Sequence, residues 1–95
     1  MDVLVAIDVE HLKDESAFVA HLEKEGFERI LEEEGFVFTG VSSTPVMHTR
    51  AYIFEVLGKA LALSPATFCN LVCQIGENPM ESYRFNKQTN TFEEA

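Results

Sequence analysis

Three side chains that can bind a divalent metal stand close together near the start of the chain. Asp8 follows the apolar residues 3–7, and Glu10 and His11 come within the next three positions. Carboxylate oxygens and imidazole nitrogens are metal ligands, and a bound cation lowers the pKa of its water so that this water can attack a phosphodiester. We therefore treat Asp8, Glu10 and His11 as a candidate Mg²⁺ or Mn²⁺ site, with Asp8 as its catalytic ligand. The alternative is that Asp8 only caps a turn or the start of the first helix.

A second group of residues could contact an anion or a nucleic acid. His48 and Arg50 lie near the start of a predicted helix, and Arg84 stands between Tyr83 and Phe85, where it could stack on a nucleobase. Tyr83 and Phe85 are also the candidate contacts of a dimer interface. An exposed helix end explains His48 and Arg50 equally well, and the two aromatic residues could instead be packing residues of a final strand.

The charge of the chain weighs against nucleic acid as a partner. Its 95 residues include 16 acidic and 7 basic side chains, a formal net charge of -9, and residues 1–47 hold 11 of the acidic ones. A negative body repels phosphates unless a basic face or a divalent cation compensates. The glutamates at positions 23, 25, 28, 32, 33 and 34 are either a solvated surface or a negative face for a basic partner.

The elements that must position these residues begin with a buried strand. Residues 3–7 are apolar at every position, which is typical of a strand covered on both sides, and such a strand is central in its sheet. Asp14 is placed to cap a helix, and Gly26 is the natural end of that helix. A length of 95 residues suits one small domain.

Residues 27–41 allow two interpretations. In the first, strands 27–31 and 36–41 form a hairpin around an acidic turn that ends in Gly35. In the second, the helix continues through Gly26 and places three glutamates in its last turn, where they oppose the negative end of the helix dipole. We favour the hairpin for this reason, and residues 36–41 are a strand in both interpretations.

The second half of the chain predicts one helix and one or two strands. Thr44 can cap a helix with Pro45 at its first position, and residues 64–65 end it near Leu63. Residues 67–75 alternate between two faces, residues 80–85 form a possible fifth strand, and residues 86–95 resemble a polar tail.

The two cysteines lie in the alternating strand 67–75. Cys69 and Cys73 are four residues apart there, so their α-carbons are separated by about 13 Å, far beyond the roughly 7 Å that a disulfide spans. We therefore expect two reduced, buried thiols.

Together these elements predict an α+β, ferredoxin-like βαββαβ fold. Its antiparallel sheet carries two helices on one face, with the first and third strands central, the second at an edge and a possible fifth strand at the carboxyl end. Residues 1–85 form the single domain, and residues 86–95 the tail.

The segment 3–8, a helix and the segment 22–30 together resemble the small CRISPR-associated nuclease-like proteins and their relatives, the VapD virulence-associated proteins and the GhoS-type antitoxin ribonucleases. The resemblance covers about the first 40 residues. It implies a ferredoxin-like fold, a homodimer whose terminal strands pair across the subunits, and in several members RNA cleavage. For Asp8 it implies that the two strand-end aspartates of a dimer face each other and hold a metal that activates water.

The first functional hypothesis is therefore a homodimeric, metal-dependent endoribonuclease-like protein of the toxin–antitoxin or CRISPR-related type. The alternatives are a non-catalytic dimeric module that captures a protein by strand addition at a sheet edge including residues 80–85, or an acidic decoy for a basic partner. No apolar run reaches the roughly 18 residues of a membrane span, and the first residues do not resemble a secretory signal. We expect a cytoplasmic protein without membrane contacts.

Overall fold

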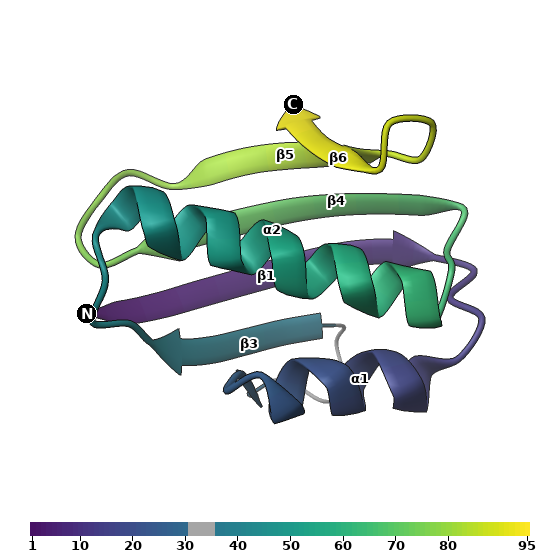
Figure 1. Cartoon of the computed structure of the whole chain (residues 1–95), viewed down its shortest axis with the longest axis horizontal. Coiled ribbons are helices and arrows are strands. Elements are labelled where there is room, and N and C mark those ends of the chain that lie inside the picture. Colours follow the sequence, from purple (N-terminus) through teal and green to yellow (C-terminus); the bar gives the residue numbers. More distant parts are fainter. Residues whose placement is uncertain (31–35) are drawn as a thin grey trace.

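The computed structural model describes residues 1–30 and 36–95, and within them the chain has an α+β fold. One antiparallel, open sheet of six strands carries two helices on a single face (Figure 1). In chain order the elements are β1 (Asp2–Glu10), α1 (Glu15–Lys24), β2 (Glu28–Arg29), β3 (Phe36–Val41), α2 (Val46–Leu63), β4 (Phe68–Ile75), β5 (Glu81–Asn86) and β6 (Thr91–Glu94). Neither helix in the described part of the chain is long and apolar enough to cross a membrane.

The strands lie side by side in the order β2-β3-β1-β4-β5-β6. As predicted, β1 and β3 are interior strands and β2 is at an edge. Val5 of β1 lies opposite Phe38 of β3 on one side and opposite Cys73 of β4 on the other. The apolar segment 3–7 is therefore hydrogen-bonded to neighbours along both of its sides.

The hairpin interpretation of residues 27–41 is confirmed for the described residues. Glu28 pairs with Thr39 and Arg29 with Phe38. Helix α1 ends where Gly26 adopts a φ of 99°, and the Phe27 amide donates to the Leu22 carbonyl at 3.0 Å. This backbone reversal at a glycine prevents the helix from continuing. The expected acidic turn, including the glutamates at 32–34, lies outside the described residues.

The carboxyl end of the chain differs from the sequence prediction. Residues 86–95 were expected to be a polar tail, but residues 91–94 form β6, which pairs with β5. The Phe92 ring stacks on Phe54 of α2 at a centroid distance of 5.2 Å and also contacts Phe85 at 5.0 Å. The contacts of one partly buried ring therefore attach an otherwise polar segment to the core as a sixth strand.

The two helices are capped differently. The Asp14 carboxylate accepts the Ala17 amide at 3.1 Å, which confirms it as the cap of α1. Helix α2 has Pro45 at its amino-terminal boundary and no side-chain cap. The expected cap, Thr44, instead bonds the hydroxyl of Thr49 at 2.9 Å.

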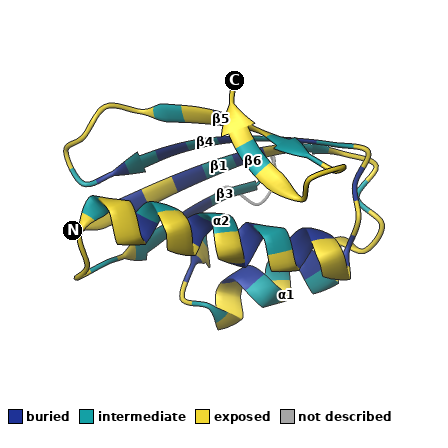
Figure 2. Ribbon diagram, turned by 45° about the horizontal axis from the view of Figure 1, so that its top comes forward, coloured by how far each residue is buried: buried dark blue, intermediate teal, exposed yellow. Residues whose placement is uncertain are grey.

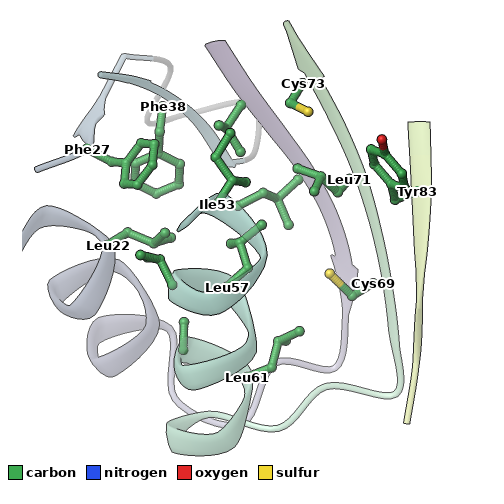
Figure 3. Packing of buried hydrophobic residues seen from close by; sticks show 14 of the residues in the cluster. Leu22, Phe27, Phe38, Ile53, Leu57, Leu61, Cys69, Leu71, Cys73 and Tyr83 are labelled. Carbon is green, nitrogen blue, oxygen red and sulfur yellow. The ribbon is translucent and has the colours of Figure 1, made fainter. Parts of the chain in front are cut away.

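The core lies between the sheet and the helices (Figure 3). Alternate residues of β1 and β4 face inward, and Ile53, Leu57 and Leu61 of α2 pack against them. Cys69 and Cys73 are free and buried, as expected. Burial raises the pKa of Cys69 to about 12 and that of Cys73 to about 11, so neither thiol is a nucleophile at neutral pH.

In the described ranges 1–30 and 36–95, the opposite side of the sheet carries no helix. Both helices lie on the same side, as Figure 2 shows, so the residues that alternate with the core positions point away from them. On β1 these outward residues include Leu4, Ala6, Asp8 and Glu10. We call this side the open face, and among the described residues no helix or strand packs over it.

Candidate functional site

Asp8 lies on the open face near the carboxyl end of β1. Its neighbours Ile7 and Val5 alternate toward the core, and the Asp8 side chain is exposed on the other side. Asp8 and Asn70 of β4 are directly opposite each other in the register. With Ala6, Val37 and Val72 among others, they line a shallow groove of about 520 Å³.

The other two expected metal ligands have different surroundings. Glu10 projects from the same face of β1 as Asp8, one pleat further along. His11 leaves the strand with a φ of 56°, and its Nδ1 lies 2.8 Å from the Thr67 hydroxyl. No group of three or more metal-ligating side chains is gathered in the part of the chain that the structure describes. A metal centre built from Asp8, Glu10 and His11 remains a prediction.

Arg50, an expected anion contact, has a carboxylate partner within the chain. Its Nε donates to Glu81 Oε1 at 2.6 Å and its Nη2 to Oε2 at 3.1 Å, and the Tyr83 hydroxyl donates to the same carboxylate. The hydrogen bond from Arg50 lowers the pKa of Glu81, and the pKa of Arg50 is raised by the same contact. The Arg50 charge therefore serves to join α2 to β5.

The two residues expected at a dimer interface pack inside the chain. Tyr83 is buried and meets Phe54 edge to face at 4.8 Å, and Phe85 contacts Phe92. Strand β5 pairs with β4 on one side and β6 on the other. Within the segment 80–85 that was predicted to be an exposed edge, residues 83–85 are therefore not free, because they pair with β6.

Arg84 points to the opposite side from Tyr83 and Phe85 and is exposed on the open face. The register places Arg84 opposite both Asn70 of β4 and Glu93 of β6. Together with Asp8 these residues form one line across four strands, which we call the polar row: Asp8, Asn70, Arg84 and Glu93. In the described residues Arg84 has no ion pair, whereas Glu93 accepts a hydrogen bond from Asn86 at 3.0 Å.

Asn70 is the half-buried member of the polar row. Its Oδ1 is shielded from solvent and accepts no hydrogen bond from the described residues. The sequence pointed to Asp8 and Arg84 but not to Asn70, which is one polar position among several on an alternating strand. Only the strand register shows that it lies between the two charges.

An apolar band lies beside the polar row on the open face. Ala6 of β1 stands opposite Val37 of β3 and opposite Val72 of β4, and Leu4 is one pleat away. The Leu4 side chain is 36% exposed, and the other three are partly exposed. The middle of the open face is therefore apolar, with charged residues next to it.

His48 belongs to a different surface. It lies in the first turn of α2 and lines a groove of about 420 Å³ with Glu25, Ser42 and Tyr52 among others. The Tyr52 hydroxyl donates to the Glu25 carboxylate at 2.9 Å, and partial burial raises the pKa of Tyr52. Because His48 is on the helical side and Arg84 on the open face, the expected anion contacts do not form one surface.

Comparisons of the chain with protein-family models, with curated proteins and with solved structures give no match. The resemblance to the CRISPR-associated and VapD-type proteins therefore stays a prediction.

Proposed function

We propose that the protein is a binding module and that the open face of its sheet is the interaction surface. The observation that carries this proposal is the apolar band of Leu4, Ala6, Val37 and Val72 on a face that no described helix or strand covers. Contiguous apolar surface on a small domain marks an interaction site more often than chance exposure does.

The surroundings of the reactive side chains also favour binding over catalysis. Both thiols are buried and have raised pKa values, so they are not activated nucleophiles. The Arg50 guanidinium forms an ion pair with Glu81, and this pair joins α2 to β5. The exposed charges Asp8 and Arg84 border the apolar band, which is the arrangement of a hydrophobic interface centre with a polar rim.

We further propose that β1 to β4 and both helices form a ferredoxin-like core to which β5 and β6 are added. The order β2-β3-β1-β4, with both helices on one side, supports this assignment. In such a layered arrangement one sheet face is left for a partner.

Photo-cross-linking in cells tests whether the open face is the interaction surface. Leu4 and Leu63 make a matched pair, because both are exposed leucines, but Leu63 ends α2 on the helical side. A photo-reactive amino acid at position 4 should give a defined cross-linked product, and the same residue at position 63 should not. Equal products from both positions, or none from position 4, would contradict the proposal.

A second candidate function is metal-dependent RNA cleavage through Asp8. The observation in its favour is that Asp8 is exposed in the groove beside Asn70, where a cation and a phosphodiester could approach it. We expect purified protein with Mg²⁺ or Mn²⁺ to cleave RNA if this function holds, and Asp8→Asn to abolish cleavage without unfolding the chain. Equal cleavage by wild type and variant, or none by either, would remove it.

A further inference from the structure

In the polar row, two opposite charges lie one strand away from the Asn70 amide on either side. Asp8 and Arg84 are each in register with Asn70, one from β1 and the other from β5. Neighbouring strands are about 4.8 Å apart, so the α-carbons of the two charged residues lie roughly 10 Å from each other across the sheet. Within the described chain Asp8 and Arg84 form no ion pair with each other or with another residue.

This arrangement is complementary to itself under a two-fold rotation. An axis that runs along β4, above the open face, places Asn70 opposite the partner's Asn70 and exchanges the positions of Asp8 and Arg84, which flank it. In a pair of chains related by this axis, Asp8 meets the partner's Arg84 and Arg84 meets the partner's Asp8. Packed sheets cross at about 30°, which displaces the ends of the row by only about 2–3 Å, within reach of an arginine side chain.

We propose that the partner bound by the open face is a second copy of this chain, docked face to face about that axis, with Asp8 and Arg84 paired between the copies. The inference rests on the proposed function, because it takes the open face as the interaction surface. It adds the identity of the partner and the residues that select it.

Asn70 supplies an observation independent of the charges. Its Oδ1 is shielded from solvent by the chain itself and accepts no hydrogen bond from the described residues, which costs free energy unless the amide turns toward the open face and meets a donor there. A side-chain amide carries both donors and an acceptor, so two amides that face each other across a two-fold axis can satisfy one another. The axis that pairs the charges also brings the two Asn70 side chains together.

The neighbouring row of the open face, formed by Ala6, Val72 and Ser82, is also compatible with a face-to-face contact between two copies. Val72 lies on the axis and would meet the partner's Val72, while Ala6 and Ser82 occupy the positions on either side. Small side chains at these flanking positions let two sheets approach closely. The apolar contact would lie directly beside the two charge pairs and shield them from water.

Charge reversal and mixing test the pairing in sedimentation velocity experiments. Asp8→Arg and Arg84→Asp each place like charges opposite one another at both ends of the interface, and we expect each to weaken dimerisation by at least about tenfold. An equimolar mixture of the two variants should restore the dimer, because each chain then faces opposite charges on the other. A purely structural effect of either substitution would not be reversed by mixing.

Glu23→Arg is the matched control, since it makes the same charge change at an exposed position of α1 on the helical side. It should leave the dimer unchanged. Folded variants whose mixture stays monomeric, or a wild-type chain that is monomeric at every concentration, would overturn the inference. If position 4 still cross-links to another protein in that case, the proposed function stands and only the second copy is excluded.

Discussion

Arg50 of α2 and Glu81 of β5 form a two-point ion pair, with Nε to Oε1 at 2.6 Å and Nη2 to Oε2 at 3.1 Å. The pair joins residues 31 positions apart in the sequence, and the Tyr83 hydroxyl donates to the same carboxylate. Strand β5 is thus attached to the helical layer as well as to β4. The ion pair therefore helps to hold β5 in place, and β6 pairs with the outer side of β5.

Glu81→Gln should destabilise the fold by about 1–3 kcal/mol at pH 7, between the values typical of exposed and buried ion pairs. The two side chains are 33% and 19% exposed, so the pair is only partly screened by solvent. Glu55→Gln is the matched control, because it breaks the largely exposed pair with Lys59 and should cost well under 1 kcal/mol. Urea denaturation measures both, and equal losses would contradict the expectation.

The same pair predicts an acid dependence. Arg50 lowers the pKa of Glu81 below the ordinary glutamate value, near 4.3. Its stabilisation is therefore complete above about pH 4.3 and is lost as the pH falls below that value. The difference in unfolding free energy between wild type and Glu81→Gln should shrink through this range. A difference that stays constant down to pH 3 would show that the charge of Glu81 is unimportant.

Tyr83 should resist ionisation in the folded protein. Burial, together with the hydrogen bond to Glu81, raises its pKa to about 12. The folded pKa exceeds the ordinary tyrosine value of about 10, so the protonated Tyr83 hydroxyl stabilises the fold. This stabilisation is complete below pH 10 and is lost as the pH rises toward 12. Absorbance at 295 nm follows the titration, and Tyr83→Phe should remove the later step. An early step lost in Tyr83→Phe would contradict the burial seen here.

The two thiols should be protected from a disulfide reagent at pH 8. Cys69 and Cys73 are buried, and their raised pKa values leave almost no thiolate. We expect both to react only as fast as the domain unfolds, whereas an exposed thiol introduced by Leu63→Cys should react at once. Rapid reaction of the native cysteines would show that the sheet opens locally near β4.

The sequence predicted those elements whose signals are local. Asp14 caps α1 and Gly26 ends it, and both depend on the residues of a single turn. Strand β6 was missed because residues 91–94 contain one apolar side chain, and that ring is held by Phe54, which lies on a different element. A contact of this kind cannot be recognised from a short window of sequence.

The candidate site was predicted in part for the same reason. The sequence predicted Asp8 at the end of an interior strand, and Arg84 between two aromatic residues of a possible fifth strand. Their common line with Asn70 depends on the registers of β1, β4 and β5, which no local pattern gives. Arg50 was interpreted as an exposed anion contact because its partner Glu81 lies far along the chain.

Two glycine substitutions should have opposite effects on stability. Gly26 has a φ of 99°, where a β-carbon is strained, so Gly26→Ala should destabilise the fold by about 1–2 kcal/mol. Gly58 lies inside α2, and an added β-carbon there meets no atom within 4 Å. Gly58→Ala should therefore stabilise the fold by about 0.5–1 kcal/mol. Denaturation midpoints that shift in the same direction would contradict the assigned backbone conformations.

A leucine pair separates the role of the open face from general hydrophobicity. Leu4 and Leu63 are both exposed, so replacing either with aspartate should leave the monomer folded. Leu4 belongs to the apolar band, and Leu4→Asp would place a charge inside the proposed interface, where it loses its hydration on association. Sedimentation should therefore show a dimer weakened at least about tenfold for Leu4→Asp and an unchanged dimer for Leu63→Asp. If Leu63→Asp alone weakened the dimer, the contact between copies would be on the helical side, and the open face would have a different partner.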